Sequence, residues 1–176
     1  MSLKRRSKKI TRRAFRYIFR NGLWASILMS VLILLFHLVG IQISRPVHPV
    51  AYFILLTFMF ITSYQYKMKG LRGWISFKQA YLSGLLMGLF SAVLFGLFMW
   101  VFVSRIDPSV SNKYYLLREN AIKLHLSGDR LAAELEAWKI YVKPVFIGLR
   151  AILELALVSL FIPLLFSIVL KKEKPE

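Results

Sequence analysis

The sequence predicts an all-α polytopic membrane protein, and three observations support this prediction. The 176 residues are 57% hydrophobic and 15% aromatic, with a mean hydropathy of +0.58, which is far more apolar than a soluble domain needs to fill one core. The 25 Lys and Arg residues against 8 Asp and Glu give a net charge of +17, in blocks separated by long apolar stretches. This alternation is typical of a chain that passes repeatedly between lipid and water. The chain has no cysteine, which excludes disulfides, thiolate catalysis and sulfur-ligated metals.

Four apolar stretches are each close to the roughly 20 residues that cross a hydrocarbon core about 30 Å thick. The first stretch is too long for a cleavable signal peptide, and no small-residue cleavage site follows it before Arg45, so we expect it to remain in the protein. The stretches predict a transmembrane domain over residues 23–170, followed by a tail of residues 171–176. The four predicted spans are residues 23–43, 50–66, 77–103 and 151–170.

The distribution of Lys and Arg beside the spans indicates the orientation. Nine of these residues lie in residues 1–20 and four in the loop of residues 67–78. Three follow Leu170, whereas the loop between the first two spans has only Arg45. Because cytoplasmic flanks carry the excess of positive charge, we expect both termini and the middle loop in the cytoplasm, with the chain in a bacterial inner membrane.

Residues 1–22 form a basic segment with the pattern of an amphipathic helix. One predicted face carries Ile10, Ala14, Tyr17 and Ile18, and the opposite face carries Arg12, Arg13, Arg16 and Arg20. We expect a helix that lies on the anionic inner leaflet and ends at Asn21 and Gly22. Such a segment captures lipid or nucleic acid, or it anchors the topology. Because it directly precedes a span, we favour the anchor and expect no nucleic acid partner.

Small residues recur at every fourth position in residues 80–96 of the third span. In lipid this spacing lets a second helix approach backbone to backbone. A helix of the same chain is the simpler partner, and a helix of another protein or of a second copy is the alternative. A capping box of Ser76 and Gln79 marks the start of this span. The predicted packing face consists of Ala80, Gly84, Gly88, Ala92 and Gly96.

Residues 107–143, on the predicted outer side, are polar but periodic. Asp107 and Pro108 predict a helix start, and Ser127, Gly128 and Asp129 predict a break and a second start. Two amphipathic helices follow, which rest on the outer leaflet, pack over the bundle or present a surface to a partner. Their predicted apolar stripes are Tyr114, Leu117, Ala121 and Leu124, and Leu131, Leu135, Trp138 and Val142.

The one acidic residue inside a predicted span is Glu154, with Arg150 four positions before it on the same helical face. Such a pair at membrane depth is a candidate site for a proton, an ion or a polar ligand. The alternative is a pair at the outer interface that reaches water. His37, His48 and His125 have no second ligand at metal-binding spacing, and no catalytic motif is present. We therefore predict no catalytic residue, no metal and no cofactor.

The stretch GWISFKQAY, from Gly73 to Tyr81, together with the glycines after it and with Ile106, Asp107 and Pro108, resembles the domain of unknown function 4199 family. These are small inner-membrane proteins of Bacteroidota-type bacteria, and the resemblance extends over most of the chain. It implies four spans and no established activity. Family members tend to be encoded near polyprenyl-phosphate glycosyltransferases, which implies an envelope glycolipid role. The basic N-terminal extension is unusual for the family.

The function that we expect from these observations is that of a non-catalytic integral membrane subunit or scaffold. It would act by helix packing in an envelope-associated complex, with a polyprenyl-phosphate glycosyltransferase as one partner. The alternative is a small transporter or lipid-handling protein that uses Arg150 and Glu154. A membrane-embedded enzyme ranks third, because no constellation of residues supports it.

Overall fold

The computed structural model describes residues 3–41, 49–125 and 127–172, with side chains from residue 15 onward. In this part of the chain all the named elements are helices, and η1 and η2 are single π-helical turns that extend α2 and α3. The elements are α1 (Leu3–Val39), α2 (Pro49–Gln65), η1 (Tyr66–Gly70), α3 (Phe77–Val101), η2 (Phe102–Ile106), α4 (Ser109–Lys123), α5 (Gly128–Tyr141) and α6 (Pro144–Leu170).

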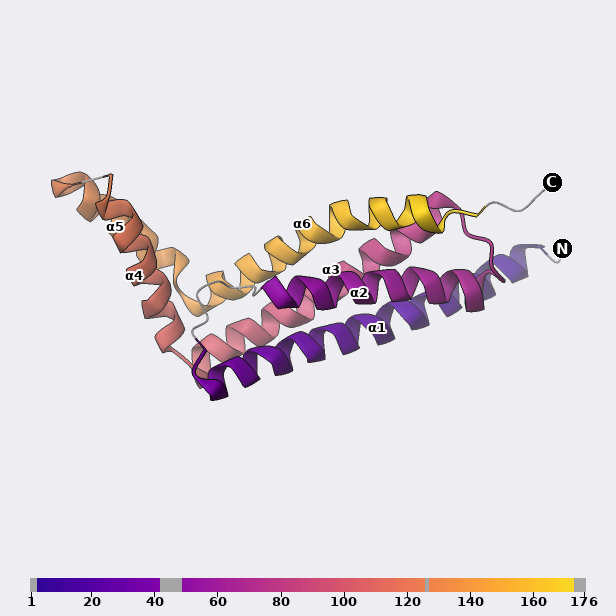
Figure 1. Cartoon of the computed structure of the whole chain (residues 1–176), viewed down its shortest axis with the longest axis horizontal. Helices are drawn as coiled ribbons and strands as arrows, with labels where there is room; N and C mark the ends of the chain where they lie inside the picture. The colour runs from indigo at the N-terminus through magenta and orange to yellow at the C-terminus, as the bar shows by residue number, and fades with distance from the viewer. Residues whose placement is uncertain (1–2, 42–48, 126, 173–176) are drawn as a thin grey trace.

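The four long helices α1, α2, α3 and α6 lie side by side as a bundle, and α4 and α5 form a hairpin that projects from one end of it (Figure 1). We name this the hairpin end. The opposite end, where α1 begins and α6 ends, is the terminal end (Figure 1). Half of the apolar window of α3 is buried, against 22% to 33% in the other three long helices. Helix α3 is therefore the central helix of the bundle.

Four helices of the described chain are long and apolar enough to cross a membrane, as the sequence predicts. The observed bounds are longer than the predicted ones at several ends. The fourth begins at Pro144 rather than at residue 151, because proline is favoured in the first helical turn and residues 144–149 are uncharged. Arg150 therefore lies inside the helix. The four candidate spans are Phe15–Val39, Pro49–Gly70, Phe77–Ile106 and Pro144–Leu170.

Large apolar side chains cover the outside of the bundle, whereas several small polar side chains are buried inside it. The buried Ser63 hydroxyl lies 3.0 Å from the Ser83 hydroxyl, and the hydroxyl of Ser159 donates to the carbonyl of Leu155. In water, an exposed apolar surface of this extent would drive aggregation, but in a membrane it contacts the equally apolar lipid chains. Exposed side chains of the spans include Leu28, Val31, Phe53, Val93, Leu97, Leu153, Leu157, Phe161, Leu165 and Ile168.

The predicted end of the N-terminal helix at Asn21 and Gly22 is wrong, because α1 continues through both residues to Val39. The Asn21 side chain donates to Thr62 Oγ1 over 3.0 Å and to Gln65 Oε1 over 3.2 Å, so its amide binds α2 instead of ending a helix. A Cβ atom at Gly22 would lie 2.7 Å from Phe90 Cδ1. This glycine permits close contact with α3. The described part of the basic segment and the first span therefore form one continuous helix.

The predicted start of α3 is confirmed. Ser76 Oγ accepts from the Gln79 backbone N–H, and the Gln79 side chain accepts from the Ser76 backbone N–H, which completes the capping box. Gly73 has a φ of +90°, which glycine adopts without strain, so it closes the turn before the box. The start of α3 was therefore predictable from the residues of this loop.

The α4–α5 hairpin has the predicted break, with Gly128 at a φ of +62°, but only one of the two predicted stripes faces inward. All four residues of the α5 stripe are partly buried. On α4 the stripe is wrong beyond Tyr114, because Leu117 and Leu124 are 50% and 79% exposed while Val110 and Ile122 are buried. Helix α4 starts at the end of the bundle and runs away from it, so it contacts the bundle core near its first residues, at Val110 (Figure 1).

Candidate functional site

The small-residue face of α3 is buried along its whole length, at Ala80, Gly84, Gly88, Ala92 and Gly96. Helix α6 lies against it. A Cβ atom at Gly84 would lie 3.1 Å from Pro163 Cβ, and one at Gly96 would lie 2.8 Å from the Gly148 carbonyl oxygen. The internal partner that the sequence favoured is thus the partner in this structure, and α6 already fills the groove.

Helix α6 contributes a reciprocal row of small residues that the sequence analysis missed. A Cβ atom at Gly148 would lie 2.7 Å from the Gly96 carbonyl oxygen, so the two backbones approach each other at a pair of glycines. The row was detectable, because small side chains recur at intervals of three, four and eight along α6. Its buried members are Gly148, Ala151, Ser159, Pro163 and Ser167.

Arg150 and Glu154 form an ion pair at the hairpin end, with 2.9 Å between Arg150 Nε and Glu154 Oε1. The Tyr52 hydroxyl of α2 donates to the second carboxylate oxygen over 3.4 Å. The Arg150 side chain is 58% exposed and that of Glu154 is 26% exposed. The carboxylate is therefore held from two helices, while one side of the guanidinium remains open.

Tyr114 of α4 extends this group of polar residues. Its hydroxyl is buried and has no hydrogen-bond partner among the described residues. Burial raises the pKa of Tyr114 well above its usual value, and the charges of Arg150 and Glu154 act on it in opposite directions. We name Tyr52, Tyr114, Arg150 and Glu154 the polar cluster. An unpaired buried hydroxyl beside an ion pair offers one donor to a polar ligand.

The described residues contain no group of three His, Cys, Asp or Glu side chains that could hold a metal ion. Of the three histidines, His37 pairs with Asp107, His125 is exposed, and His48 lies outside the described residues. The polar cluster has a carboxylate and a guanidinium but no nucleophile activated by a base. Its groups can bind and orient an ionic ligand.

Asp107 links α1 to the hairpin. Its carboxylate lies 3.2 Å from His37 Nδ1 and 3.8 Å from Lys113 Nζ, and it accepts from the Ser109 backbone N–H over 3.1 Å. Burial alone would raise the pKa of Asp107, but the Ser109 hydrogen bonds and the charges of Lys113 and His37 lower it below its usual value. The carboxylate thus fulfils the predicted capping role, although α4 begins one residue later than expected.

Replacing Asp107 by asparagine should lower the Tm, and the difference from the wild type should depend on pH. A carboxyl group whose folded pKa is depressed stabilises the fold above its unfolded pKa of about 4, and this stabilisation is lost as the pH falls through the folded pKa. The Asp107→Asn effect should therefore be full at pH 7, about 1 kcal/mol, and shrink below about pH 4. Thermal unfolding of both proteins from pH 7 to pH 3 measures it. A difference that is constant with pH would contradict the ionic role.

Of the four basic residues predicted to face the membrane surface, the structure describes the side chains of Arg16 and Arg20. Arg12 and Arg13 lie in α1, but their side chains are outside the described ones. Arg16 is exposed, whereas Arg20 donates to Gln65 Oε1 over 3.0 Å and lies 5.7 Å from the ring centroid of Tyr17. Arg20 therefore contributes to the contact between α1 and α2.

The bundle and its hairpin define the protein as a polytopic α-helical membrane protein. A family model described as "Protein of unknown function (DUF4199)" matches residues 20–172, which is most of the chain. The chain belongs to this family, as the stretch from Gly73 to Tyr81 indicated. The match leaves out residues 1–19, which contain most of the basic segment. No curated protein and no solved structure matches the chain.

Proposed function

We propose that this protein is a non-catalytic integral membrane subunit or scaffold of an envelope-associated complex, and that the α4–α5 hairpin is the surface that binds its partner. One observation carries this proposal: the hairpin extends beyond the bundle with an apolar surface that nothing in the described chain covers (Figure 1). The small-residue face of α3 is occupied by α6, so docking needs another surface. The exposed apolar residues of the hairpin are Leu116, Leu117, Leu124, Ile140 and Tyr141.

The composition of the hairpin supports a protein partner. Helix α5 has no buried residue, although it carries a tryptophan, a tyrosine and several aliphatic side chains. Aromatic residues and Arg are enriched in protein interfaces, and here Arg118 lies 4.9 Å from the ring centroid of Trp138. The partner class that we propose is a polyprenyl-phosphate glycosyltransferase of the same membrane, which is the class implied by the family resemblance.

For the location we propose a bacterial inner membrane, with both termini in the cytoplasm. The support is the excess of Lys and Arg at the terminal end, where three flanking segments carry sixteen of these residues: nine in residues 1–20, four in residues 67–78 and three after Leu170. The basic segment would then meet the anionic lipids of the inner leaflet. On this orientation the hairpin lies on the outer side, where it is accessible to an enzyme that handles envelope glycolipids.

The test is co-purification from membranes in a gentle detergent, with a polyprenyl-phosphate glycosyltransferase co-expressed and quantified. Changing Leu116, Leu117 and Leu124 together to alanine should weaken partner binding about a hundredfold and remove most of the recovered enzyme, since each exposed leucine buried in an interface contributes roughly 1 kcal/mol. The matched control changes Leu153, Leu157 and Leu165 to alanine. These are exposed leucines of α6 that face lipid, and recovery should be unchanged.

Undiminished recovery with the hairpin variant would show that the hairpin is not the docking surface. A wild-type chain that always purifies as a monomer would contradict the scaffold proposal. A homodimer that is lost in the hairpin variant would show that the partner of the hairpin is a second copy of this chain and not the enzyme.

The polar cluster favours a second candidate function, in which the protein handles or transports a polar or lipid ligand at the hairpin end. The observation behind it is the unpaired Tyr114 hydroxyl next to the Arg150 and Glu154 pair. A guanidinium that is half exposed at membrane depth fits a phosphate or carboxylate group. The substitution Glu154→Gln separates the two candidates, because it removes the charge of the ion pair and leaves the hairpin surface unchanged.

A further inference from the structure

A cavity of about 540 Å³ lies at the terminal end of the bundle, next to the loop between η1 and α3. It is separate from the polar cluster and from the hairpin, which lie at the other end (Figure 1). Pockets for small ligands are typically 300–1,000 Å³, so this volume is sufficient for a lipid headgroup. The residues of its lining that matter here are Arg72, Trp74, Ile75, Ser76, Gln79 and Lys172.

Contacts between distant parts of the chain build the wall of this cavity. Ile75 and Lys172 form an antiparallel bridge in which each backbone N–H donates to the other carbonyl over 3.0 Å. The Lys67 ammonium donates to the carbonyl of Leu170 over 2.9 Å and fixes the end of α6 beside η1. The loop, the start of α3 and the segment after α6 are thus held together, and the cavity is preformed.

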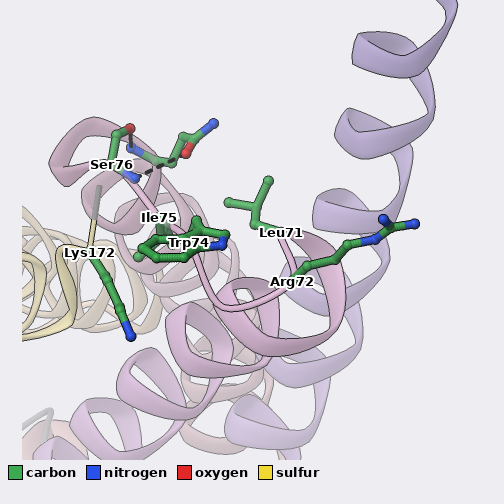
Figure 2. A pocket seen from close by; sticks show the side chains of 7 residues that line it. Leu71, Arg72, Trp74, Ile75, Ser76 and Lys172 are labelled. Carbon is green, nitrogen blue, oxygen red and sulfur yellow. Dashed lines mark hydrogen bonds between the residues drawn. The ribbon is translucent and has the colours of Figure 1, made fainter. Parts of the chain in front are cut away.

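Two cations line the cavity on either side of Trp74. Figure 2 shows Lys172 beside the ring, and Arg72 on the other side with its side chain directed away from the ring. Lys172 Nζ lies 5.0 Å from the ring centroid of Trp74, which is within the range of a cation–π contact. No acidic residue is among the residues that line the cavity, so neither cation is neutralised by its lining.

The position of the cavity along the bundle limits what it meets. The second span ends at Gly70, the third begins at Phe77, and the fourth ends at Leu170. Residues 71–76 and Lys172 therefore lie immediately outside three spans, at the level of the lipid headgroups. Tryptophan and long cationic side chains are typical of this layer, where the ring meets the glycerol region and the charges meet phosphate.

We propose that this cavity is a binding site for the phosphate group of an anionic lipid headgroup, in the leaflet at the terminal end of the bundle. Arg72 and Lys172 provide the positive charge, and Trp74 contacts the glycerol and the start of the acyl chains. The bridge between Ile75 and Lys172 keeps the site assembled, so a bound lipid would stabilise the contact between the middle loop and α6. This site is independent of the partner proposed for the hairpin.

The test measures the Tm of the full chain in dodecyl maltoside micelles during titration with dihexanoyl phosphatidic acid. Binding to the folded state raises the Tm in a concentration-dependent way. The double variant Arg72→Gln, Lys172→Gln should bind with at least about tenfold weaker apparent affinity, because it loses both charge-assisted contacts. The matched control is Lys69→Gln, Lys78→Gln, which removes the same charge at the same end from exposed residues that do not line the cavity, and it should bind as the wild type does.

Two further titrations distinguish the source of the phosphate. Dihexanoyl phosphatidylcholine should give a smaller shift, because its choline group offsets the phosphate charge. Inorganic phosphate at equal concentration should give little shift, because it lacks the glycerol and chains that contact Trp74. An equal response to inorganic phosphate would overturn the lipid assignment. An equal loss in the cavity variant and the control, or no shift with phosphatidic acid at all, would overturn the site.

Discussion

Replacing Gly88 by leucine should lower the free energy of unfolding by about 3 kcal/mol, the upper part of the range for overpacking a tight core. A Cβ atom there would lie 2.8 Å from Ser159 Cβ and closer still to Ser159 Oγ and Met59 Cε. Met59 has a flexible end and can move, but the Cβ atom of Ser159 is fixed to the backbone of α6. The added side chain therefore has to separate α3 from α6. Equilibrium unfolding in mixed micelles, followed by circular dichroism, measures the loss.

The matched control for this substitution is Val93→Leu, on the same helix but at an exposed position that faces lipid. It adds apolar volume without meeting another helix, so its unfolding free energy should stay within about 0.5 kcal/mol of the wild type. If Gly88→Leu is equally mild, the close packing of α3 on α6 described here is not the arrangement in the membrane.

The second large effect concerns the ion pair of α6. Changing Arg150 alone to leucine should destabilise the bundle by about 2 kcal/mol, since it leaves the Glu154 carboxylate with the Tyr52 hydroxyl as its hydrogen-bond partner at membrane depth. Partial exposure of both side chains keeps the value below that of a fully buried pair. The double change Arg150→Leu, Glu154→Leu removes both charges and should recover most of the loss. A double-mutant cycle on unfolding free energies measures the coupling.

Glu154→Gln separates a structural role of this pair from a functional one. The amide keeps the shape and can still accept from Tyr52, so the bundle should fold and assemble. A ligand-handling function would be lost in this variant, whereas a subunit that works through the hairpin would retain partner binding. Additive losses in the cycle would mean that Arg150 and Glu154 act independently, which contradicts the 2.9 Å ion pair.

Much of the fold was predictable because the decisive signals are local. Long apolar stretches specify the spans, and Ser76 with Gln79 specifies the start of α3, since each needs only neighbouring residues. The prediction for Asn21 and Gly22 was wrong because it used only local signals. The local pattern predicts a helix end at these residues, but in the structure they contact Thr62 and Phe90 on other helices, and these contacts depend on the tertiary arrangement.

The candidate sites divide in the same way. The pair of Arg150 and Glu154 was visible as an i, i+4 spacing, but Tyr52 and Tyr114 reach it from other helices and gave no signal in the sequence. The cavity at the terminal end was missed entirely, because it depends on pairing Lys172 with Ile75 across the whole second half of the chain. In this chain, the site formed by residues of one helix could be predicted from the sequence, and the sites formed by residues of several elements could not.

The unbroken first helix also sets how far the chain reaches from the bilayer. Its 37 residues correspond to about 55 Å at 1.5 Å per residue, nearly twice the hydrocarbon thickness of about 30 Å. Residues 3–14 precede the first span and form a rod about 18 Å long. Attraction to lipid charge decays within a Debye length of about 8 Å, so a rod directed away from the bilayer carries its distal cations beyond the field of the membrane. The attraction of the basic segment to anionic lipid would then come mainly from the basic residues nearest the first span, with little contribution from the distal ones.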